Sequence, residues 1–258
     1  MKGIFVLAPI ALFVVGCSCG NEDVPELPQG KPAGHVEVIF DATDKHQVYA
    51  DFLPSKKPNS DRIVLLFHQA RSNASEYETI APKIAKLGFD CLAVDQRAGG
   101  DMWGRVNRTV NKSGAGGYPE AYNDLVGALR YAKAKKYTTI VAWGSSYSAA
   151  LIFRLAAENP EVSAVVAFSP GEYMDEHGIV SQWAKKVTVP VLFACTPDEW
   201  EDGRSELFDQ IASKKKTSVA LAGGVHGSST LIADKSTAAG QYMEKVTDFF
   251  TELAKANP

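Results

Sequence analysis

From about residue 61 onward, short uninterrupted apolar runs alternate with segments long enough to form helices. This pattern is typical of parallel strands buried on both faces, because helices cover each side of such a sheet. The apolar runs lie at 63–67, 91–94, 139–143, 162–168, 189–194 and 218–221. Helices are expected at 77–87, 119–134, 148–158, 205–212 and 238–256. The alternation therefore predicts an α/β domain.

Two further strands are expected ahead of these runs. Residues 35–40 and 47–53 alternate apolar and polar side chains across a turn-forming segment, which predicts a hairpin with one exposed face. The result is an eight-stranded, mostly parallel sheet, its first two strands antiparallel, with helices on both faces. Segments 97–118 and 171–186 lack helical periodicity and follow strand ends, where open α/β sheets bind ligands. Both are short, so only a small cap is expected.

Composition and charge exclude several classes of protein. With 45% hydrophobic and 22% charged residues, the 258-residue chain is not disordered, collagen-like or a coiled coil. Its net charge of −3, from 27 basic and 30 acidic residues without a basic block, excludes nucleic acid as a partner. Cys91 and Cys195 lie inside apolar runs and are expected to be buried thiols rather than a disulfide. No cysteine pair has the spacing of a zinc site, so we expect no metal and no cofactor.

The amino terminus has the features of a secretion signal. Lys2 precedes the apolar run 4–15, which is too short to span a bilayer as a mature helix, for which about 20 residues are needed. Val14-Val15-Gly16-Cys17 then resembles the lipobox of bacterial lipoproteins, in which cleavage precedes a cysteine that carries lipid. The alternative is an ordinary signal peptide that happens to contain a cysteine.

The lipobox resemblance implies a lipoprotein signal peptide at 1–16 and lipidation of Cys17. Residues 17–34, rich in Gly, Pro and acidic side chains, are expected to be a flexible tether to a folded domain at 35–258. The protein would then be anchored to a membrane of the cell envelope, outside the cytoplasm, on the periplasmic face or the cell surface of a bacterium. Which membrane is involved stays open.

A candidate nucleophile lies between the run 139–143 and the helix expected from residue 148. Gly144-Ser145-Ser146-Tyr147-Ser148 has the form small-x-Ser-x-small, which a tight strand-to-helix turn needs in order to close around its serine. Ser148 replaces the usual second glycine but is still compact. A strict G-x-S-x-G match at 16–20 falls in the leader and tether and lacks that context. We therefore expect Ser146 to be the nucleophile.

An acid and a base are expected after the serine, in that order along the chain. His226 follows the last apolar run and precedes the final helix, which makes it the candidate base. Asp198 is the first carboxylate beyond the run 189–194 and is the expected acid. It would orient His226, which would take the proton of Ser146. Three further carboxylates crowd the same loop and remain open as the acid: Glu199, Glu201 and Asp202.

Together these features resemble the α/β-hydrolase superfamily, nearest the dienelactone-hydrolase-like branch of compact esterases with small caps, over about residues 35–257. The resemblance rests on Phe67-His68-Gln69-Ala70, Val94-Asp95-Gln96-Arg97, Gly144–Ser148, Pro190–Asp198 and His226-Gly227. It implies an α/β-hydrolase catalytic domain at 35–258. It also implies an oxyanion hole made by the backbone N–H groups of Tyr147 and Ala70, rather than Gln69.

Two departures from the family pattern matter. Many relatives have His-Gly where this chain has His68-Gln69, which leaves the geometry of the oxyanion hole and the direction of the Gln69 side chain open. Dienelactone hydrolases use a cysteine nucleophile, whereas the residue here is Ser146, which points to ester hydrolysis.

The expected function is that of a membrane-anchored serine hydrolase that cleaves carboxylic esters of small or medium size through an acyl-enzyme. Acyl transfer or peptide hydrolysis on the same triad, and a catalytically silent lipoprotein that binds a ligand, are the alternatives. Several aromatic residues and methionines on loops after strand ends could line a substrate pocket: Met102, Trp103, Tyr147, Tyr173, Met174, Trp183 and Trp200. Arg71, Arg97 and Arg105 could bind a carboxylate or a sugar hydroxyl, or be solvated. The natural substrate and the oligomeric state stay open.

Overall fold

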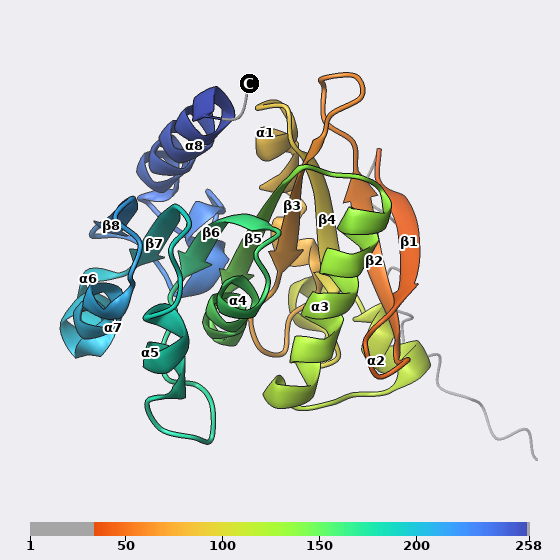
Figure 1. The fold of residues 1–258 in the computed structure, drawn as a ribbon, viewed down its shortest axis with the longest axis horizontal. Helices are drawn as coiled ribbons and strands as arrows, with labels where there is room; N and C mark the ends of the chain where they lie inside the picture. The colour runs from red at the N-terminus through yellow and green to blue at the C-terminus, as the bar shows by residue number, and fades with distance from the viewer. Residues whose placement is uncertain (1–33, 257–258) are drawn as a thin grey trace, which may run out of the picture.

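The computed structural model describes residues 34–256, which fold around one eight-stranded sheet (Figure 1). The strand order is β1-β2-β4-β3-β5-β6-β7-β8. The strands are β1 (Val36–Asp41), β2 (Gln47–Leu53), β3 (Arg62–Phe67), β4 (Asp90–Asp95), β5 (Thr139–Ser145), β6 (Val162–Phe168), β7 (Val191–Cys195) and β8 (Lys216–Ala220). β2 runs antiparallel to both β1 and β4, and every other pair is parallel. The expected mostly parallel sheet is confirmed, with β2 as its one reversed strand.

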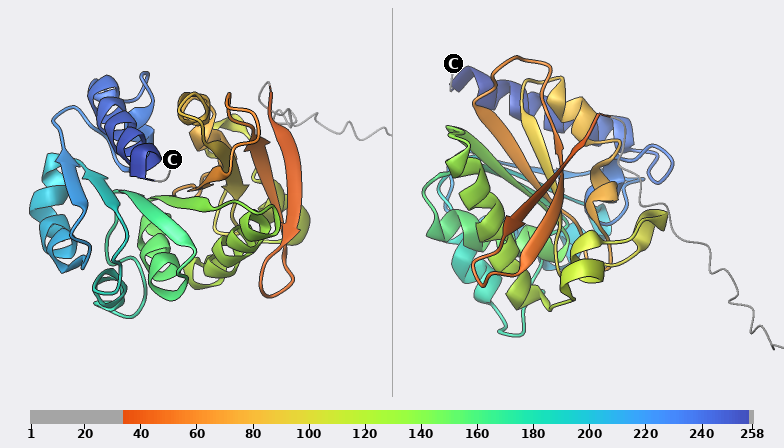
Figure 2. Two further views of the ribbon diagram at one scale, coloured as in Figure 1. Left: turned by 45° about the horizontal axis from the view of Figure 1, so that its top comes forward. Right: turned by 90° about the vertical axis from the view of Figure 1, so that its right-hand side faces the viewer.

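Helices cover both faces of the sheet (Figure 2). The α-helices are α1 (Ala81–Ala85), α2 (Arg108–Ser113), α3 (Tyr118–Ala134), α4 (Tyr147–Glu158), α5 (Ile179–Ala184), α6 (Pro197–Glu199), α7 (Ser205–Gln210) and α8 (Ala239–Ala256). Turns of 3₁₀ helix are η1 (Ala74–Tyr77), η2 (Met102–Gly104) and η4 (Gly227–Leu231), and η3 (Trp200–Arg204) is a turn of π-helix. α1 and α8 lie on one face, and α3, α4 and α5 lie on the other (Figures 1 and 2). Within residues 34–256, no helix is both long and apolar enough to cross a membrane.

β3 shows why the apolar runs became central strands. All six of its residues are buried, and successive side chains point to opposite faces of the sheet. Ile63, Leu65 and Phe67 join the core under α3 and α4, whereas Val64 and Leu66 join the core under α8. A strand between two helical layers therefore needs apolar residues at every position, which produces an unbroken run rather than an alternating one.

The helix expected at 77–87 is divided in two in the structure. η1 ends at Tyr77, and α1 begins at Ala81 with Pro82 in its first turn. A proline lacks the N–H that a helix interior needs but is tolerated where a helix starts. Pro82 therefore favours a new start over a continuous helix.

Ion pairs made by buried arginines hold the segment 97–118 against the sheet. Arg97 binds Asp124 at 2.6 Å and Asp44 at 2.6 Å, and Arg105 binds Asp51 at 2.9 Å. The possibility that Arg97 and Arg105 bind substrate is corrected by these contacts, because both side chains are already engaged within the fold. This part of the cap is therefore a fixed wall of the site.

Cys91 and Cys195 are buried free thiols, as expected. Each lies on a strand, and burial raises the pKa of both thiols, that of Cys195 to about 12. A thiol that stays protonated is a weak nucleophile.

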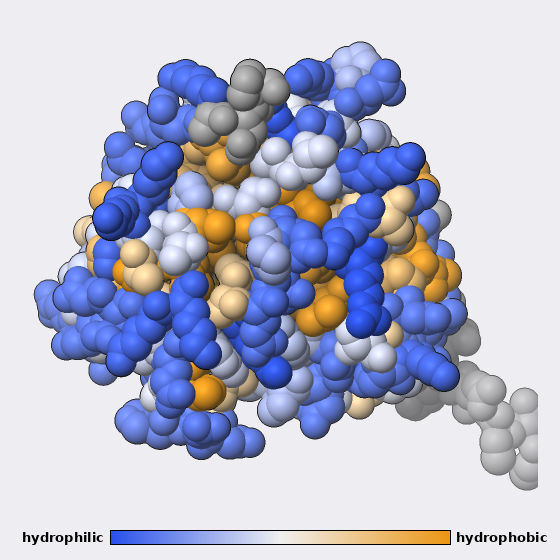
Figure 3. All heavy atoms as spheres, viewed as in Figure 1, coloured by the Kyte–Doolittle hydropathy of each residue, from blue (hydrophilic) through white to orange (hydrophobic). Residues whose placement is uncertain are grey.

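The outer surface in the view of Figure 3 is largely hydrophilic, with small apolar areas between charged side chains.

Candidate active site

Ser146 lies at the turn between β5 and α4, in a backbone conformation that side chains rarely adopt. Its φ is 58° and its ψ is −123°, so the residue is held in a strained geometry that presents its hydroxyl beyond the carboxyl end of the strand. Gly144 makes this turn possible, because a Cβ there would lie 2.5 Å from the backbone C and O of Ser148. The local sequence therefore folds into the turn that the small-x-Ser-x-small pattern predicted.

Ser148, which replaces the usual second glycine, uses its hydroxyl to hold the start of α4. The hydroxyl donates to the carbonyl of His68 at 2.6 Å and accepts from Nε2 of Gln96 at 2.9 Å. These bonds join α4 to the segments that follow β3 and β4. The departure from glycine thus adds contacts between the helix that follows the nucleophile and the two neighbouring strand ends.

The structure brings His226 into contact with Ser146. Nε2 of His226 lies 2.8 Å from Oγ of Ser146, and Nδ1 lies 2.5 Å from Oε1 of Glu199. Because a carboxylate can only accept, Nδ1 carries the hydrogen and Nε2 is left as an acceptor for the serine proton. The tautomer follows from these partners, and it is the one that a general base requires.

Glu199, not Asp198, supplies the carboxylate that contacts His226. Asp198 is exposed and makes no hydrogen bond or ion pair with any residue of the described chain, so the expectation that it reaches His226 is corrected. Both residues lie in the single turn α6, where neighbouring side chains point about 100° apart. The turn directs Glu199 toward the histidine and Asp198 toward solvent.

A capping box explains the direction of Glu199. The Thr196 hydroxyl accepts from the N–H of Glu199 at 3.2 Å, and Oε2 of Glu199 accepts from the N–H of Thr196 at 2.9 Å. This reciprocal pair is the T-x-x-E signature of a helix start, visible in the sequence as Thr196-Pro197-Asp198-Glu199. That signature could have identified Glu199 as the residue turned back toward the strand end.

The environment of Glu199 keeps it ionised. Burial acts to raise the pKa of its carboxyl, but hydrogen bonds from His226, from the N–H of Thr196 and from the hydroxyl of Ser169 lower it to about 2. The bond from Ser169 is 2.7 Å long, and the same hydroxyl accepts from the N–H of Gly227 at 2.9 Å. Glu199 is therefore a fixed negative charge that can stabilise a protonated His226.

Two backbone N–H groups are free to form an oxyanion hole. Those of Tyr147 and Ala70 have no hydrogen-bond partner within residues 34–256. The N–H of Gln69, by contrast, donates to Oε2 of Glu76 at 2.9 Å. The Gln69 side chain is directed to Ser229, whose hydroxyl accepts from its Nε2 at 2.8 Å. Gln69 thus lies aside from the place that a developing oxyanion would occupy.

His68 is a structural residue that orients the Ala70 N–H. Its Nδ1 lies 2.7 Å from the carbonyl of Gln69, and its Nε2 accepts from the N–H of Gln96 at 3.0 Å. Burial lowers the pKa of His68, so its ring is neutral. Because the Gln69–Ala70 peptide is planar and trans, the Ala70 N–H points away from the carbonyl that His68 holds.

An open pocket of about 420 Å³ adjoins His226. It is lined by Met102, Trp103, Val225, His226, Ser229 and Lys235. Nε1 of Trp103 donates to the Ser72 hydroxyl at 2.8 Å, and Nζ of Lys235 lies 5.5 Å from the centre of the Trp103 ring. Met102 and Trp103 thus line it as expected. Tyr173 lines a second pocket, between α5 and α7, and its hydroxyl also faces the side chain of Ser146.

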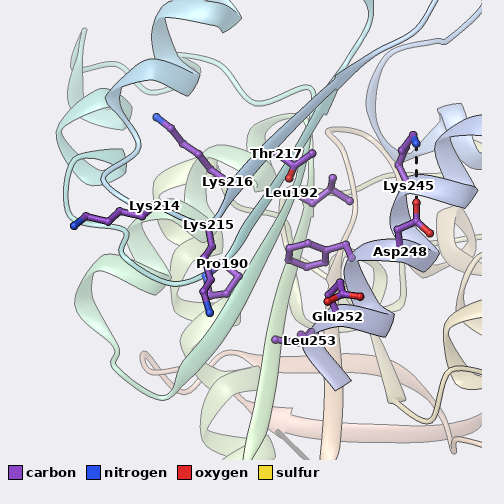
Figure 4. Close-up of a pocket in the computed structure, with 11 residues that line it drawn as sticks. Pro190, Leu192, Lys214, Lys215, Lys216, Thr217, Lys245, Asp248, Glu252 and Leu253 are labelled. Carbon is purple, nitrogen blue, oxygen red and sulfur yellow. Dashed lines mark ion pairs between the residues drawn. The ribbon is translucent and has the colours of Figure 1, made fainter. Parts of the chain in front are cut away.

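A larger pocket of about 580 Å³ is drawn in Figure 4, and its lining includes none of Ser146, His226 and Glu199. It is formed between α8 and the start of β8, where Leu192, Phe249 and Leu253 form an apolar floor with lysines at its edge. The starts of parallel strands lie at the opposite end of the sheet from Ser146. Within the described chain, no cluster of three or more His, Cys, Asp or Glu side chains could hold a metal ion.

The strand order and the position of the serine turn are those of the α/β hydrolases. A family model described as "Serine aminopeptidase, S33" matches residues 58–198, more than half of the chain, and the chain belongs to this family. The superfamily resemblance predicted from the sequence is thereby confirmed. No curated protein matches the chain significantly.

Several solved structures have the same fold. The Pyrococcus furiosus esterase Pf2001 is 18% identical, with a TM-score of 0.65 over 84% of this chain and 90% of its own. Est1E from Butyrivibrio proteoclasticus is 14% identical, with a TM-score of 0.64 over 85% and 99% of the two chains. A dienelactone hydrolase from Anabaena variabilis is 16% identical, with a TM-score of 0.64 over 85% and 98%. At these identities the similarity shows the fold alone.

Proposed function

We propose that this protein is a serine hydrolase that cleaves carboxylic esters of small or medium size. The observation that carries the proposal is the continuous hydrogen-bonded chain from Ser146 through His226 to Glu199, with distances of 2.8 Å and 2.5 Å. A nucleophile, its base and an orienting acid at such distances are the geometric requirement for acyl transfer through a covalent intermediate.

The chemistry proceeds in two steps. Oγ of Ser146 attacks the ester carbonyl carbon while Nε2 of His226 takes its proton, and the oxygen anion that forms is bound by the N–H groups of Tyr147 and Ala70. Collapse of this intermediate breaks the ester bond, and His226 gives the proton to the leaving alkoxide. Water, deprotonated by His226, then attacks the carbonyl carbon of the acyl-enzyme. The bond to Oγ of Ser146 breaks, His226 returns the proton to that oxygen, and the acid is released.

The shape of the site supports a substrate of limited size. The pocket beside His226 is open, and the segment around η2 forms one of its walls. Because His226 protonates the leaving group, the alcohol part of the ester would occupy this pocket, between Trp103 and Val225. No long lid is present in the described chain to enclose a bulky triglyceride.

Peptide hydrolysis is the second candidate, favoured by the description of the matching family as serine aminopeptidases. The same triad can attack an amide, since the chemistry differs in the leaving group that His226 must protonate. Release of amine from aminoacyl p-nitroanilides, compared with release of p-nitrophenol from esters, would separate the two activities. Product analysis with added alcohols would detect acyl transfer.

Fluorophosphonate labelling of a purified protein that comprises residues 17–258 tests the proposal. We expect the wild type to be labelled on Ser146 and to hydrolyse p-nitrophenyl acetate and butyrate, because the phosphonate traps an activated serine. Ser146→Ala should show neither labelling nor turnover. A folded wild type that is not labelled would contradict the proposal and favour a ligand-binding lipoprotein.

We further propose that Cys17 is lipidated and anchors the domain to the cell envelope. Cys17 lies outside the described residues, and the proposal rests on the lipobox-like sequence alone. Expression of the full chain in a bacterium should give a protein in the membrane fraction whose amino-terminal peptide carries diacylglycerol and acyl chains by mass spectrometry. Cys17→Ser should appear in the soluble fraction without that mass. An unmodified Cys17 in the wild type would favour an ordinary signal peptide.

A further inference from the structure

Glu76 is a fully buried carboxyl group beside the site, and the reaction as described does not use it. It lies in η1 with no exposed surface, and within the described chain it forms no ion pair. Burial raises the pKa of its carboxyl to about 7. A buried acid without a cation partner lowers stability when it ionises, so its presence next to a catalytic serine calls for an explanation.

The contacts of Glu76 join the segments that carry the reacting groups. Oε2 accepts from the N–H of Gln69 at 2.9 Å, directly before Ala70. Oε1 accepts from the hydroxyl of Ser145 at 2.7 Å, directly before Ser146. The Ser145 hydroxyl in turn accepts from the N–H of Ser228 at 2.8 Å, two residues after His226. One carboxyl group therefore connects the oxyanion loop, the nucleophile strand and the histidine loop.

We propose that Glu76 is a positioning residue that sets the oxyanion hole against Ser146. The Gln69 N–H is held by Glu76 and the Gln69 carbonyl by His68, so the peptide groups on both sides of Gln69 are fixed. The direction of the Ala70 N–H follows from that arrangement. This inference rests on the proposed function, because an oxyanion hole matters only if an oxyanion forms.

The hydrogen-bonding pattern favours the ionised form of Glu76. The N–H and Nε2 of Gln69 can only donate, and the Ser145 hydroxyl donates to Oε1 while it accepts from the N–H of Ser228, so both carboxyl oxygens act as acceptors. The titratable groups that face it are His226, Tyr77 and Tyr147. None of these groups is a permanent cation that would keep Glu76 ionised at low pH. Protonation of Glu76 would then disturb its bonds to the loop that contains Gln69 and Ala70.

Glu76→Gln tests the proposal because it keeps the size of the side chain and removes the carboxylate. One of the three donors would then face an amide NH₂ group. We expect kcat for p-nitrophenyl butyrate to fall about 10- to 100-fold, with KM within about threefold, because oxyanion contacts are made in the transition state and not with bound substrate. Glu78→Gln, an exposed glutamate two residues along, is the matched control and should retain wild-type kcat.

Two further measurements distinguish positioning from a purely structural role. Below neutral pH, the acid limb of log kcat/KM should be steeper by about one unit of slope in the wild type than in Glu76→Gln, because only the wild type has a carboxyl at position 76 to protonate. The folded-state pKa of Glu76 is raised, so the wild type loses stability as pH rises from about 4.5 to about 7, and the loss is complete above that range. Glu76→Gln avoids this loss and should melt no lower than the wild type at pH 8.

Active sites are counted by complete fluorophosphonate labelling, so kcat is compared per folded site even if a variant is partly unfolded. A kcat in Glu76→Gln within twofold of the wild type would overturn the positioning role, as would a loss confined to KM or an equal loss in Glu78→Gln. A wild type that neither labels nor turns over would instead overturn the proposed function, and this inference with it.

Discussion

Glu199→Gln is expected to lower kcat for p-nitrophenyl butyrate by about 10³- to 10⁴-fold, whereas Asp198→Asn is expected to stay within about twofold of the wild type. Glu199 accepts the Nδ1 hydrogen of His226 at 2.5 Å and carries the charge that stabilises the protonated histidine. A glutamine at 199 removes that charge, and its NH₂ group can bind Nδ1 in the wrong tautomer. Steady-state kinetics on the two purified variants checks both expectations.

The pair Glu199→Gln and Asp198→Asn is matched, because the residues are adjacent in α6 and each change removes one charge at constant size. The melting temperature of each variant shows whether a loss of activity reflects unfolding. If Asp198→Asn had the larger loss, or if Glu199→Gln stayed within tenfold of the wild type, Glu199 would not be the triad acid. Since its pKa is about 2, Glu199 stays ionised at any working pH and contributes no acid limb.

The fold could be predicted because each of its strands has a characteristic pattern of apolar residues in the sequence. A central strand such as β3 contacts helices on both faces, which requires an unbroken apolar run. The edge strand β1 is half exposed, which produces an alternating run. Where a proline restricts the backbone, as Pro82 does in α1, the helix boundary shifts from the one that the apolar periodicity predicts. These signals need only a few neighbouring residues.

Which carboxylate contacts His226 depends on the direction of its side chain. The distance of a residue from the strand end does not determine that direction. Asp198 is nearer to β7 along the chain, but the capping box of Thr196 and Glu199 closes a turn there and reverses the expected preference. Recognising T-P-D-E as a helix start would have favoured the glutamate. The signal was present in the sequence but belonged to helix capping rather than to catalysis.

The role of Glu76 could not be predicted from the sequence. Its partner Ser145 is 69 residues away along the chain, and its burial depends on the packing of η1 against the sheet. The direction of Gln69 has the same origin, because Ser229, which receives its amide, is 160 residues distant. Contacts of this kind exist only after the sheet has assembled, so local patterns carry no mark of them.

Gly144→Ala is expected to lower kcat at least about 100-fold, because the nucleophile turn cannot close around a side chain. A Cβ at position 144 would lie 2.5 Å from C and O of Ser148 and 2.6 Å from N of Ala149, and all three are backbone atoms that cannot rotate away. The start of α4 must therefore move, and Ser146 moves with it relative to His226. Kinetics and fluorophosphonate labelling rates measure the effect.

Gly240→Ala is the matched control, since it adds the same methyl group where α8 has open space around it. Alanine is tolerated at least as well as glycine in the first turn of a helix, so this variant should be no less stable than the wild type and fully active. Urea unfolding of the two variants compares their stabilities. Wild-type kcat in Gly144→Ala would mean that the turn relaxes without displacing the serine hydroxyl, and the strained turn would then not be a requirement for activity.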